Sequence, residues 1–183
     1  QNHQKYNFNI FDDSYNSNMV EYIDDIQLLG NIKDVPSDSL VLVSIGDNKN
    51  RALYFDKFSN QLLKENLFHK TSILEKNVKI GISNQIFAHA YINSYSKIGN
   101  NNIINTSSIL EHEVVIGNHN HISISAKLCG RVSIGDNCLI GASATIIDKI
   151  VICDNVIVGA GAVVTKNITE PGTYVGIPAR KIK

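Results

Sequence analysis

The sequence predicts a mainly β protein in which a parallel β-helix follows a small α/β N-terminal part. An aliphatic residue recurs at every sixth position from Ile80 to Val164, and a small or β-branched residue usually follows it four positions later. Between them lie GNNN, GNHN, GDN and CDN, whose Gly, Asn and Asp tolerate the left-handed backbone of a tight corner. An inward aliphatic, an inward small residue and a corner describe one side of a parallel β-helix.

The length of the repeat predicts how the coils stack. Three sides of six residues make a coil of about eighteen, so residues 80–168 supply about five coils spaced ~4.8 Å apart. Leu74 extends the register one repeat backwards. The terminal TEPGTYVGIPARKIK breaks the period with prolines and glycines, and is predicted to cap the open end. We therefore expect a β-helix domain with a C-terminal cap over residues 67–183.

Residues 1–66 follow a different pattern. NFNIFDD reads as a short strand that ends in two aspartates, LVLVSIG as a buried strand that ends in glycine, and DNKNRALYFDKFSNQLLKEN as a helix with one apolar face. In a parallel α/β layer, ligands lie beyond the carboxyl ends of the strands, where Asp12, Asp13 and Gly46 fall. A plainer interpretation makes the aspartates a turn and Asp47 a helix cap.

Composition excludes several classes of partner. Seventeen basic residues balance seventeen acidic ones, which gives no electrostatic reason to expect a nucleic acid or an anionic membrane. No apolar run approaches the ~18 residues that a membrane span needs, so we expect a cytoplasmic protein. The three cysteines have no CxxC spacing, which argues against a disulfide framework or a zinc knuckle.

The segment NTSSILEHEVVIG holds the most distinctive chemistry, because His112 lies between Glu111 and Glu113. A carboxylate that accepts one imidazole N–H fixes the tautomer and raises the basicity of the other nitrogen, which a general base requires. No Ser or Cys has a similarly placed partner, so direct transfer fits better than a covalent enzyme intermediate. A plainer interpretation leaves the triplet as solvated surface.

Stacking every eighteen residues turns sequence positions into neighbours. Ser94 and Gly130 are expected on either side of His112, and Gly130 leaves the adjacent space open to a ligand. Glu113 and Arg131 fall within reach of an ion pair across coils. Ala142 and Ala160 are eighteen apart as well, and are expected to form a shallow apolar column along which a slender ligand could lie.

The uninterrupted hexads, NTSSILEHEVVIG and the terminal GIPAR resemble the left-handed β-helix acyltransferases that acetylate amino or hydroxyl groups of sugars, above all the bacterial UDP-4-amino-sugar N-acetyltransferases of the bacillosamine pathway. Sialic acid O-acetyltransferases and perosamine N-acetyltransferases are relatives. The resemblance covers nearly the whole chain. It implies a left-handed coil, acetyl-CoA as co-substrate, and a homotrimer with each site between two neighbours. It also implies that residues 1–66 are a partial Rossmann-like nucleotide-sugar-binding domain, whose usual first strand and glycine-rich loop do not precede Gln1.

The resemblance assigns roles to individual positions. His112 matches the general base, Glu113 its orienting acid, and Asn105 a polar residue of the same pocket. The positions that match contacts to acetyl-CoA are His121, Gly130, Ala142 and Ala160. The positions that match contacts to the nucleotide part of the substrate are Asp12, Asp13 and Gly46. No metal ligand is implied.

The favoured function is therefore acetylation of the 4-amino group of a UDP-linked amino-dideoxy sugar, with His112 as the base. Three alternatives stay open at this point: O-acetylation of a sialic acid type of hydroxyl, N-acetylation of a GDP-perosamine type of sugar, and an inactive trimeric scaffold that only binds. A metal site of the kind found in β-helical carbonic anhydrases is disfavoured, because the histidines lack that family's spacing.

Overall fold

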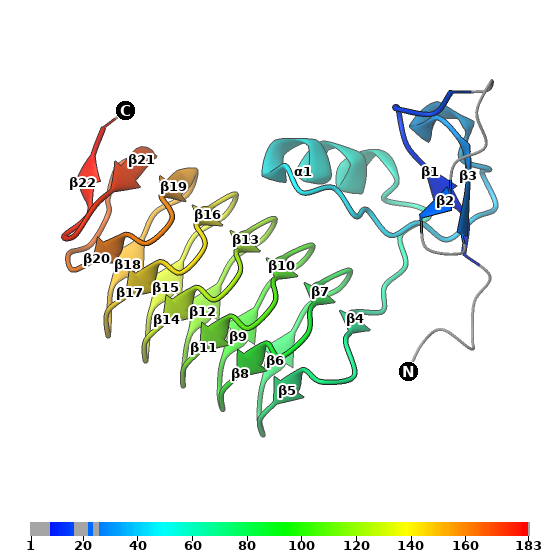
Figure 1. The fold of residues 1–183 in the computed structure, drawn as a ribbon. Coiled ribbons are helices and arrows are strands. Elements are labelled where there is room, and N and C mark those ends of the chain that lie inside the picture. Colours follow the sequence, from blue (N-terminus) through cyan, green and yellow to red (C-terminus); the bar gives the residue numbers. More distant parts are fainter. Residues whose placement is uncertain (1–7, 17–21, 24–25, 183) are drawn as a thin grey trace.

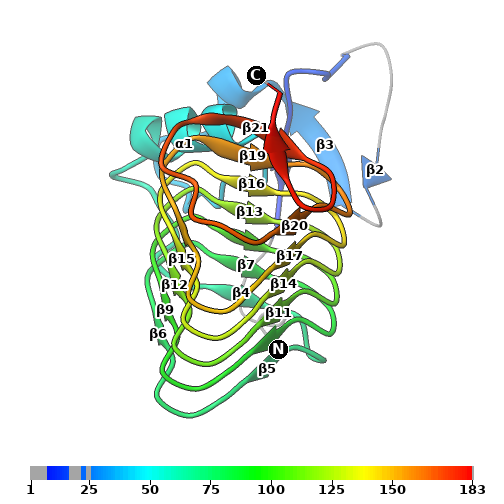
Figure 2. The same cartoon turned by 90° about the vertical axis from the view of Figure 1, so that its left-hand side faces the viewer.

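The chain forms a three-sided solenoid with a small α/β part beside it, as Figure 1 shows. The computed structural model describes residues 8–16, 22–23 and 26–182. Three parallel sheets make the sides of the solenoid, and Figure 2 looks along the stacked coils from the C-terminal end. The mainly β class and the parallel β-helix are confirmed.

Sheet I contains eight strands: β4 (Leu67–Phe68), β7 (Gln85–Ile86), β10 (Ile103–Ile104), β13 (His121–Ile122), β16 (Leu139–Ile140), β19 (Val156–Val158), β21 (Gly172–Val175) and β22 (Arg180–Lys181). Sheet II contains β5 (Ile73–Leu74), β8 (Tyr91–Ile92), β11 (Ile109–Leu110), β14 (Lys127–Leu128), β17 (Thr145–Ile146) and β20 (Val163–Val164). Sheet III contains β6 (Lys79–Ile80), β9 (Lys97–Ile98), β12 (Val115–Ile116), β15 (Ser133–Ile134) and β18 (Val151–Ile152).

The register between coils is eighteen residues throughout the stack. Ile104 lies opposite Ile86 on one side and Ile122 on the other, and the same offset holds on sheets II and III. The aliphatic hexad residues from Ile86 to Val164 are buried, and so are the smaller residues that follow four positions later, such as Ala90. The predicted inward face is therefore the hydrophobic core.

Every corner contains one residue in the left-handed conformation. The φ angle lies between 55° and 64° at every sixth residue from Asn77 to Asn155. Several of these residues are not the Gly, Asn or Asp that the sequence argument relied on, and Glu113 and Arg131 are among them. Asparagine at the corners thus needs a further explanation.

That explanation is a ladder of buried amides at the corner between sheets III and I. Asn102 donates from Nδ2 to Asn84 Oδ1 at 3.0 Å and to Gly117 O at 3.0 Å, and its Oδ1 accepts from Asn120 N at 2.8 Å. Asn84 and Asn120 repeat the pattern on the neighbouring coils. Each amide therefore satisfies backbone groups that the tight corner leaves without strand partners.

The N-terminal part is simpler than predicted. β1 (Ile10–Phe11) pairs in parallel with β3 (Ile26–Gly30), which pairs antiparallel with β2 (Tyr22–Ile23). A 3₁₀ turn, η1 (Ile32–Asp34), follows, and among the described residues α1 (Asn48–Lys57) is the one α-helix. A partial Rossmann-like unit over residues 1–66 is not shown, and residues 1–7 of that range lie outside the described part.

The predicted strand LVLVSIG is wrong. Over these residues the backbone makes one isolated bridge, between Val41 and Leu62. The side chain of Gln85 on sheet I bonds both Val43 O and the Ser44 hydroxyl, so a solenoid side chain takes the place of a strand neighbour. The predicted helix forms, but it ends at Lys57 rather than extending through the whole segment.

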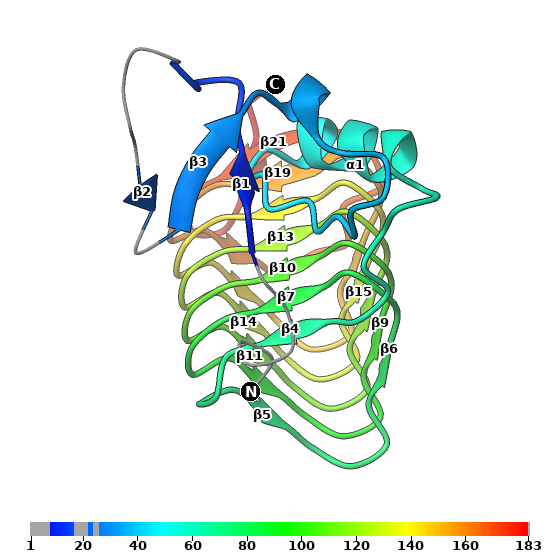
Figure 3. The same cartoon turned by 90° about the vertical axis from the view of Figure 1, so that its right-hand side faces the viewer.

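Arg51 fastens α1 to the solenoid, alongside sheet I (Figure 3). Its guanidinium is buried and donates to backbone carbonyls of Ile45, Gly46, Asn101, His119 and Asn120 and to the Asn48 side chain. Burial lowers the pKa of Arg51 to about 10, which still leaves it charged at neutral pH. One side chain thus joins the helix, the loop before it and two coils.

The C-terminal segment caps the solenoid as predicted. β21 pairs in parallel with β19 over the last coil, and β22 folds back antiparallel onto β21. The Lys181 ammonium lies 2.9 Å from Glu170. The antiparallel hairpin ends the parallel stack at this side of the molecule.

Replacement of Asn102 with alanine tests the amide ladder. We expect Asn102→Ala to lower the free energy of unfolding by about 2–4 kcal/mol, because it leaves buried groups of Asn84, Gly117 and Asn120 without partners. The midpoint of thermal unfolding, followed by circular dichroism, should fall by about 5–10 °C. Lys97→Ala, at an exposed outward position of sheet III, is the control and should leave the midpoint nearly unchanged. An equal shift in both variants would contradict the ladder's role.

Candidate active site

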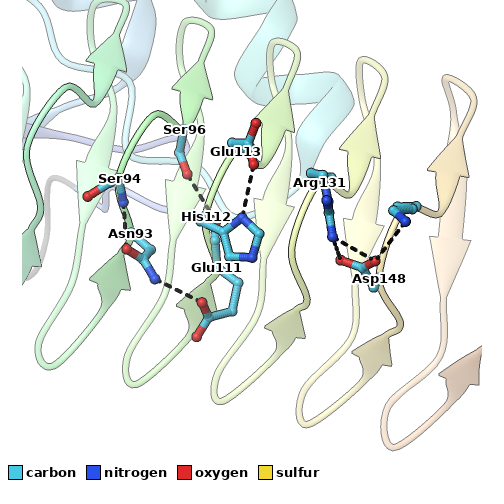
Figure 4. Close-up of polar contacts among 9 residues, drawn as sticks. Asn93, Ser94, Ser96, Glu111, His112, Glu113, Arg131 and Asp148 are labelled. Atoms are coloured by element: carbon cyan, nitrogen blue, oxygen red, sulfur yellow. Dashed lines mark hydrogen bonds and ion pairs between the residues drawn. The ribbon is translucent and has the colours of Figure 1, made fainter.

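The triplet around His112 lies at the corner between sheets II and III, between β11 and β12. His112 Nδ1 is 3.1 Å from Glu113 Oε2, and the two side chains are 47 % and 55 % exposed. A carboxylate can only accept, so Nδ1 carries the proton and the Nε2 lone pair faces outward. The predicted contact between His112 and Glu113 is present (Figure 4).

The second carboxylate of the triplet has a different partner. Glu111 Oε2 accepts from Asn93 Nδ2 at 2.8 Å on the preceding coil, and Ser96 Oγ donates to the Glu111 carbonyl at 3.1 Å. Figure 4 shows Glu111 turned away from the imidazole toward Asn93. Glu113 is therefore the carboxylate that orients His112.

The His112 imidazole lies close to Gly130 on the next coil. A methyl group at Gly130 would come within 2.6 Å of His112 Nε2 and 2.9 Å of Asp148 Oδ1, so only glycine leaves these two groups undisturbed. The predicted pair between Glu113 and Arg131 is wrong. Arg131 Nη2 instead lies 3.2 Å from both oxygens of Asp148, because Glu113 is engaged by His112.

A second cluster occupies the corner between sheets I and II. Asn105 Oδ1 accepts from Thr106 N at 2.7 Å, which turns its Nδ2 toward His121 Nε2 at 3.0 Å. His121 Nε2 must therefore accept, and its Nδ1–H points at Gly46 O, 3.4 Å away. Burial lowers the pKa of His121, the bond to the Gly46 carbonyl opposes this shift, and the Arg51 charge adds to it. The net shift favours the neutral imidazole.

The predicted apolar column rises from the same corner. Ala142 is half-buried and Ala160 is exposed, and Ile124 stands one coil below Ala142 with 51 % of its surface exposed. The predicted residues thus separate into two groups at adjacent corners of one prism. Asn105, His121, Ala142 and Ala160 form one group, and His112, Glu113 and Gly130 form the other.

The predicted nucleotide residues lie in the N-terminal part. Asp12 Oδ1 accepts from Ser14 N at 2.8 Å, and hydrogen bonds from the Ser14 side chain and backbone lower the pKa of Asp12. Asp13 Oδ2 is 3.3 Å from the Tyr54 hydroxyl of α1. Asp47 caps α1 by accepting from Asn50 N at 2.9 Å, so the plainer turn-and-cap interpretation of this region holds. Gly46 contacts Arg51 and His121 through its carbonyl.

Two residues of these corners were missed by the sequence reasoning. Asp148 lies eighteen positions after Gly130, so the register could have placed it beside that glycine. Arg51 gave no comparable signal, because its partners are carbonyls up to 69 residues away. In the described part of the chain, no three His, Cys, Asp or Glu side chains come together as a metal site would need. The same residues contain no helix long and apolar enough to cross a membrane.

The two partly buried histidines predict how stability depends on pH. Burial lowers the pKa of both His119 and His121 from about 6.5, so unfolding takes up protons below that pH. We expect the free energy of unfolding to fall as the pH drops from 7 through 6.5 toward 5.5, in urea titrations. His121→Asn should weaken this dependence, whereas His89→Asn at an exposed corner should not; a slope unchanged in His121→Asn would contradict the assignment.

Comparison with known sequences finds two overlapping repeat families. Residues 113–148 match "Bacterial transferase hexapeptide (six repeats)", and residues 131–166 match "Hexapeptide repeat of succinyl-transferase". No curated protein sequence matches. The family matches cover the coils that hold Gly130, Ala142 and Asp148.

Solved structures extend the likeness to most of the chain. A mutant perosamine N-acetyltransferase from Caulobacter crescentus, in complex with CoA and GDP-perosamine, superposes with a TM-score of 0.86 at 26 % identity, over 91 % of this chain and 82 % of that one. WeeI from Acinetobacter baumannii gives 0.81 at 26 %, over 88 % and 81 %. The acetyltransferase domain of PglB from Neisseria gonorrhoeae with acetyl coenzyme A gives 0.85 at 22 %, over 94 % and 84 %, which shows the fold.

The hexads, the solenoid that they build and these likenesses lead to one assignment. Residues 113–166 match hexapeptide-repeat transferase models, and the chain has a left-handed β-helix fold similar to that of the solved sugar N-acetyltransferases.

Proposed function

We propose that the chain transfers an acetyl group from acetyl-CoA to the 4-amino group of a UDP-linked amino-dideoxy sugar, with His112 as general base. The observation that carries the proposal is the geometry at Gly130. His112 Nδ1 is held by Glu113 at 3.1 Å, and Nε2 lies beside Gly130, where any side chain would clash with it. An oriented, half-exposed imidazole is what direct transfer to a bound amine requires.

The chemistry needs one proton acceptor and no covalent enzyme intermediate. The lone pair of the amine forms a bond to the acetyl carbon, the carbonyl π electrons move onto oxygen, and a proton passes from nitrogen to His112 Nε2. Collapse of the tetrahedral intermediate breaks the C–S bond, and the departing CoA thiolate takes up a proton. Glu113 stabilises the imidazolium that forms in the first step.

The column at the corner between sheets I and II fits the pantetheine arm of acetyl-CoA. Ile124, Ala142 and Ala160 present small or apolar side chains in line along the solenoid axis, and neutral His121 stands at the foot of the column. A neutral imidazole does not repel a cationic amine, as an imidazolium would. These residues and Gly130 are the cofactor contacts of the proposal.

The two corners belong to one site if a second copy of the chain supplies the missing half. Asn105 and His112 flank sheet II and are separated by β11 within one protomer. We therefore include a homotrimer in the proposal, in which the His112 corner of one copy meets the Asn105 corner of the next.

The N-terminal part would hold the nucleotide. Asp12, Asp13 and Gly46 lie on the small sheet and the loop before α1, and the Gly46 carbonyl connects that loop to His121. GDP-perosamine is bound by the Caulobacter neighbour, which covers 91 % of this chain. A GDP-linked amino sugar is accordingly the second candidate substrate.

The first test follows CoA thiol release from acetyl-CoA with a UDP-4-amino-4,6-dideoxy sugar. We expect His112→Ala to lower kcat about 10²-fold or more, because the base is lost while the fold is kept. Lys97→Ala, on the outer surface of sheet III, should turn over like the wild type. Equal rates in His112→Ala and the wild type would remove His112 from the mechanism.

Mixing two inactive variants tests the shared site. We expect Asn105→Ala and His112→Ala to be inactive alone, and co-assembled trimers of the two to regain about a quarter of wild-type activity. That fraction arises because one in four neighbouring pairs joins an intact His112 corner to an intact Asn105 corner. Activity that stays at the background of the single variants, in trimers verified by two affinity tags, would mean that no site combines residues of two copies and would overturn the shared site.

A further inference from the structure

Two polar side chains, His112 and Asp148, lie on either side of Gly130. His112 Nε2 and Asp148 Oδ1 would lie 2.6 and 2.9 Å from a Cβ at residue 130, so at most 5.5 Å separates the two atoms. We call the space between them, on the outer side of Gly130, the Gly130 gap. Figure 4 shows the imidazole and the Asp148 carboxylate on either side of the coil that holds Arg131. A group bound against His112 in this gap therefore also meets Asp148.

The Asp148 carboxylate is held in place and can still accept further hydrogen bonds. Arg131 Nη2 lies 3.2 Å from each carboxylate oxygen, and Lys149 Nζ is 3.9 Å from Oδ2. The Asp148 side chain is 44 % exposed, so its oxygens remain accessible. One nitrogen shared between two oxygens leaves further acceptor capacity on Oδ1, the oxygen that faces the gap.

An amine and a hydroxyl differ in the hydrogen bonds that they can make to His112 and Asp148. A neutral amine has two hydrogens, so it can give one to His112 Nε2 and donate the other to Asp148 Oδ1. A hydroxyl has one hydrogen, which His112 must take. Its oxygen would then turn only lone pairs toward the Asp148 carboxylate, which repels them.

The charge that develops during transfer favours the same orientation. Attack on the acetyl carbon makes the nitrogen positive and the carbonyl oxygen negative. A carboxylate stabilises the first and destabilises the second, so the nitrogen and not the carbonyl oxygen must lie beside Asp148. Nothing else is required of Asp148, since the proton still goes to His112.

We propose that Asp148 is a specificity-determining residue, which accepts a hydrogen bond from the acceptor nitrogen across the Gly130 gap and so selects amines over hydroxyls. The inference rests on the proposed acetyl transfer at His112, and it deepens that proposal by fixing the class of nucleophile. Arg131 is a positioning residue for the Asp148 carboxylate.

The test compares an amino sugar with its hydroxyl counterpart in the Asp148→Asn variant. Because Arg131 can only donate, it will hold the new amide oxygen and turn the amide NH₂ toward the gap. We expect kcat/KM for the UDP-4-amino-4,6-dideoxy sugar to fall at least about tenfold. The inhibition constant of the matching UDP-4-hydroxy sugar, measured as a competitor, should stay the same or fall.

Two controls separate this role from a structural one. Glu75→Gln removes the same charge at the same kind of corner, two coils below Glu111, and should change neither quantity. Arg131→Gln removes the partner of Asp148 but keeps its carboxylate, so it should retain most of the preference for the amine. The midpoint of thermal unfolding shows that each variant is folded.

The outcomes are distinct. Loss of amine turnover with unchanged binding of the hydroxyl sugar supports the inference. The inference is overturned if kcat/KM for the amino sugar is equal in the wild type and Asp148→Asn. It is also overturned if the variant binds both sugars more weakly by the same factor. Either result leaves the proposed function standing. A wild type that transfers nothing to the amino sugar overturns the proposed function and this inference with it.

Discussion

The eighteen-residue register between coils is the constraint on which the structure depends. It is maintained by parallel strands of two or three residues, which by themselves are too short to fix a register. The buried amides of Asn84, Asn102 and Asn120 add a second lock, because each bonds the backbone of a neighbouring coil at the same corner. A slip by one residue would bury an outward side chain and break every rung of this ladder at once.

The same register builds the candidate site without an enclosed cavity. Side chains that are far apart in sequence, such as His112 and Asp148, come close together because they stand two coils apart on one straight edge, with only Gly130 between them. The rigid stack holds these polar groups at a fixed spacing before any ligand binds, as the walls of a pocket do in other enzymes. Arg51 fixes the N-terminal part against the stack, because it donates hydrogen bonds both to the Gly46 carbonyl and to the backbone of two coils.

The repeat made the solenoid predictable, because one period sets both the core and the corners. The hexads from Ile80 to Val164, the cap and the pairing of His112 with Glu113 all follow from local pattern. The N-terminal part carried no such period, and LVLVSIG looked like a strand although a Gln85 side chain bonds its backbone. Arg131 was paired with the wrong carboxylate, since register tells which residues are near and not which of two acceptors is free. The separation of the site between two corners also needed the three-dimensional sheets.

The corners with positive φ have a consequence for how such a chain can change in length. A single inserted residue within a strand would rotate all later positions by one step around the prism and turn the inward hexad residues to solvent. An insertion that bulges outward at a corner leaves the phase of every later coil intact. Length variation is therefore confined to the corners, the same places where His112 and Asn105 stand, so new loops would arise beside the site and could reshape its entrance without touching the core.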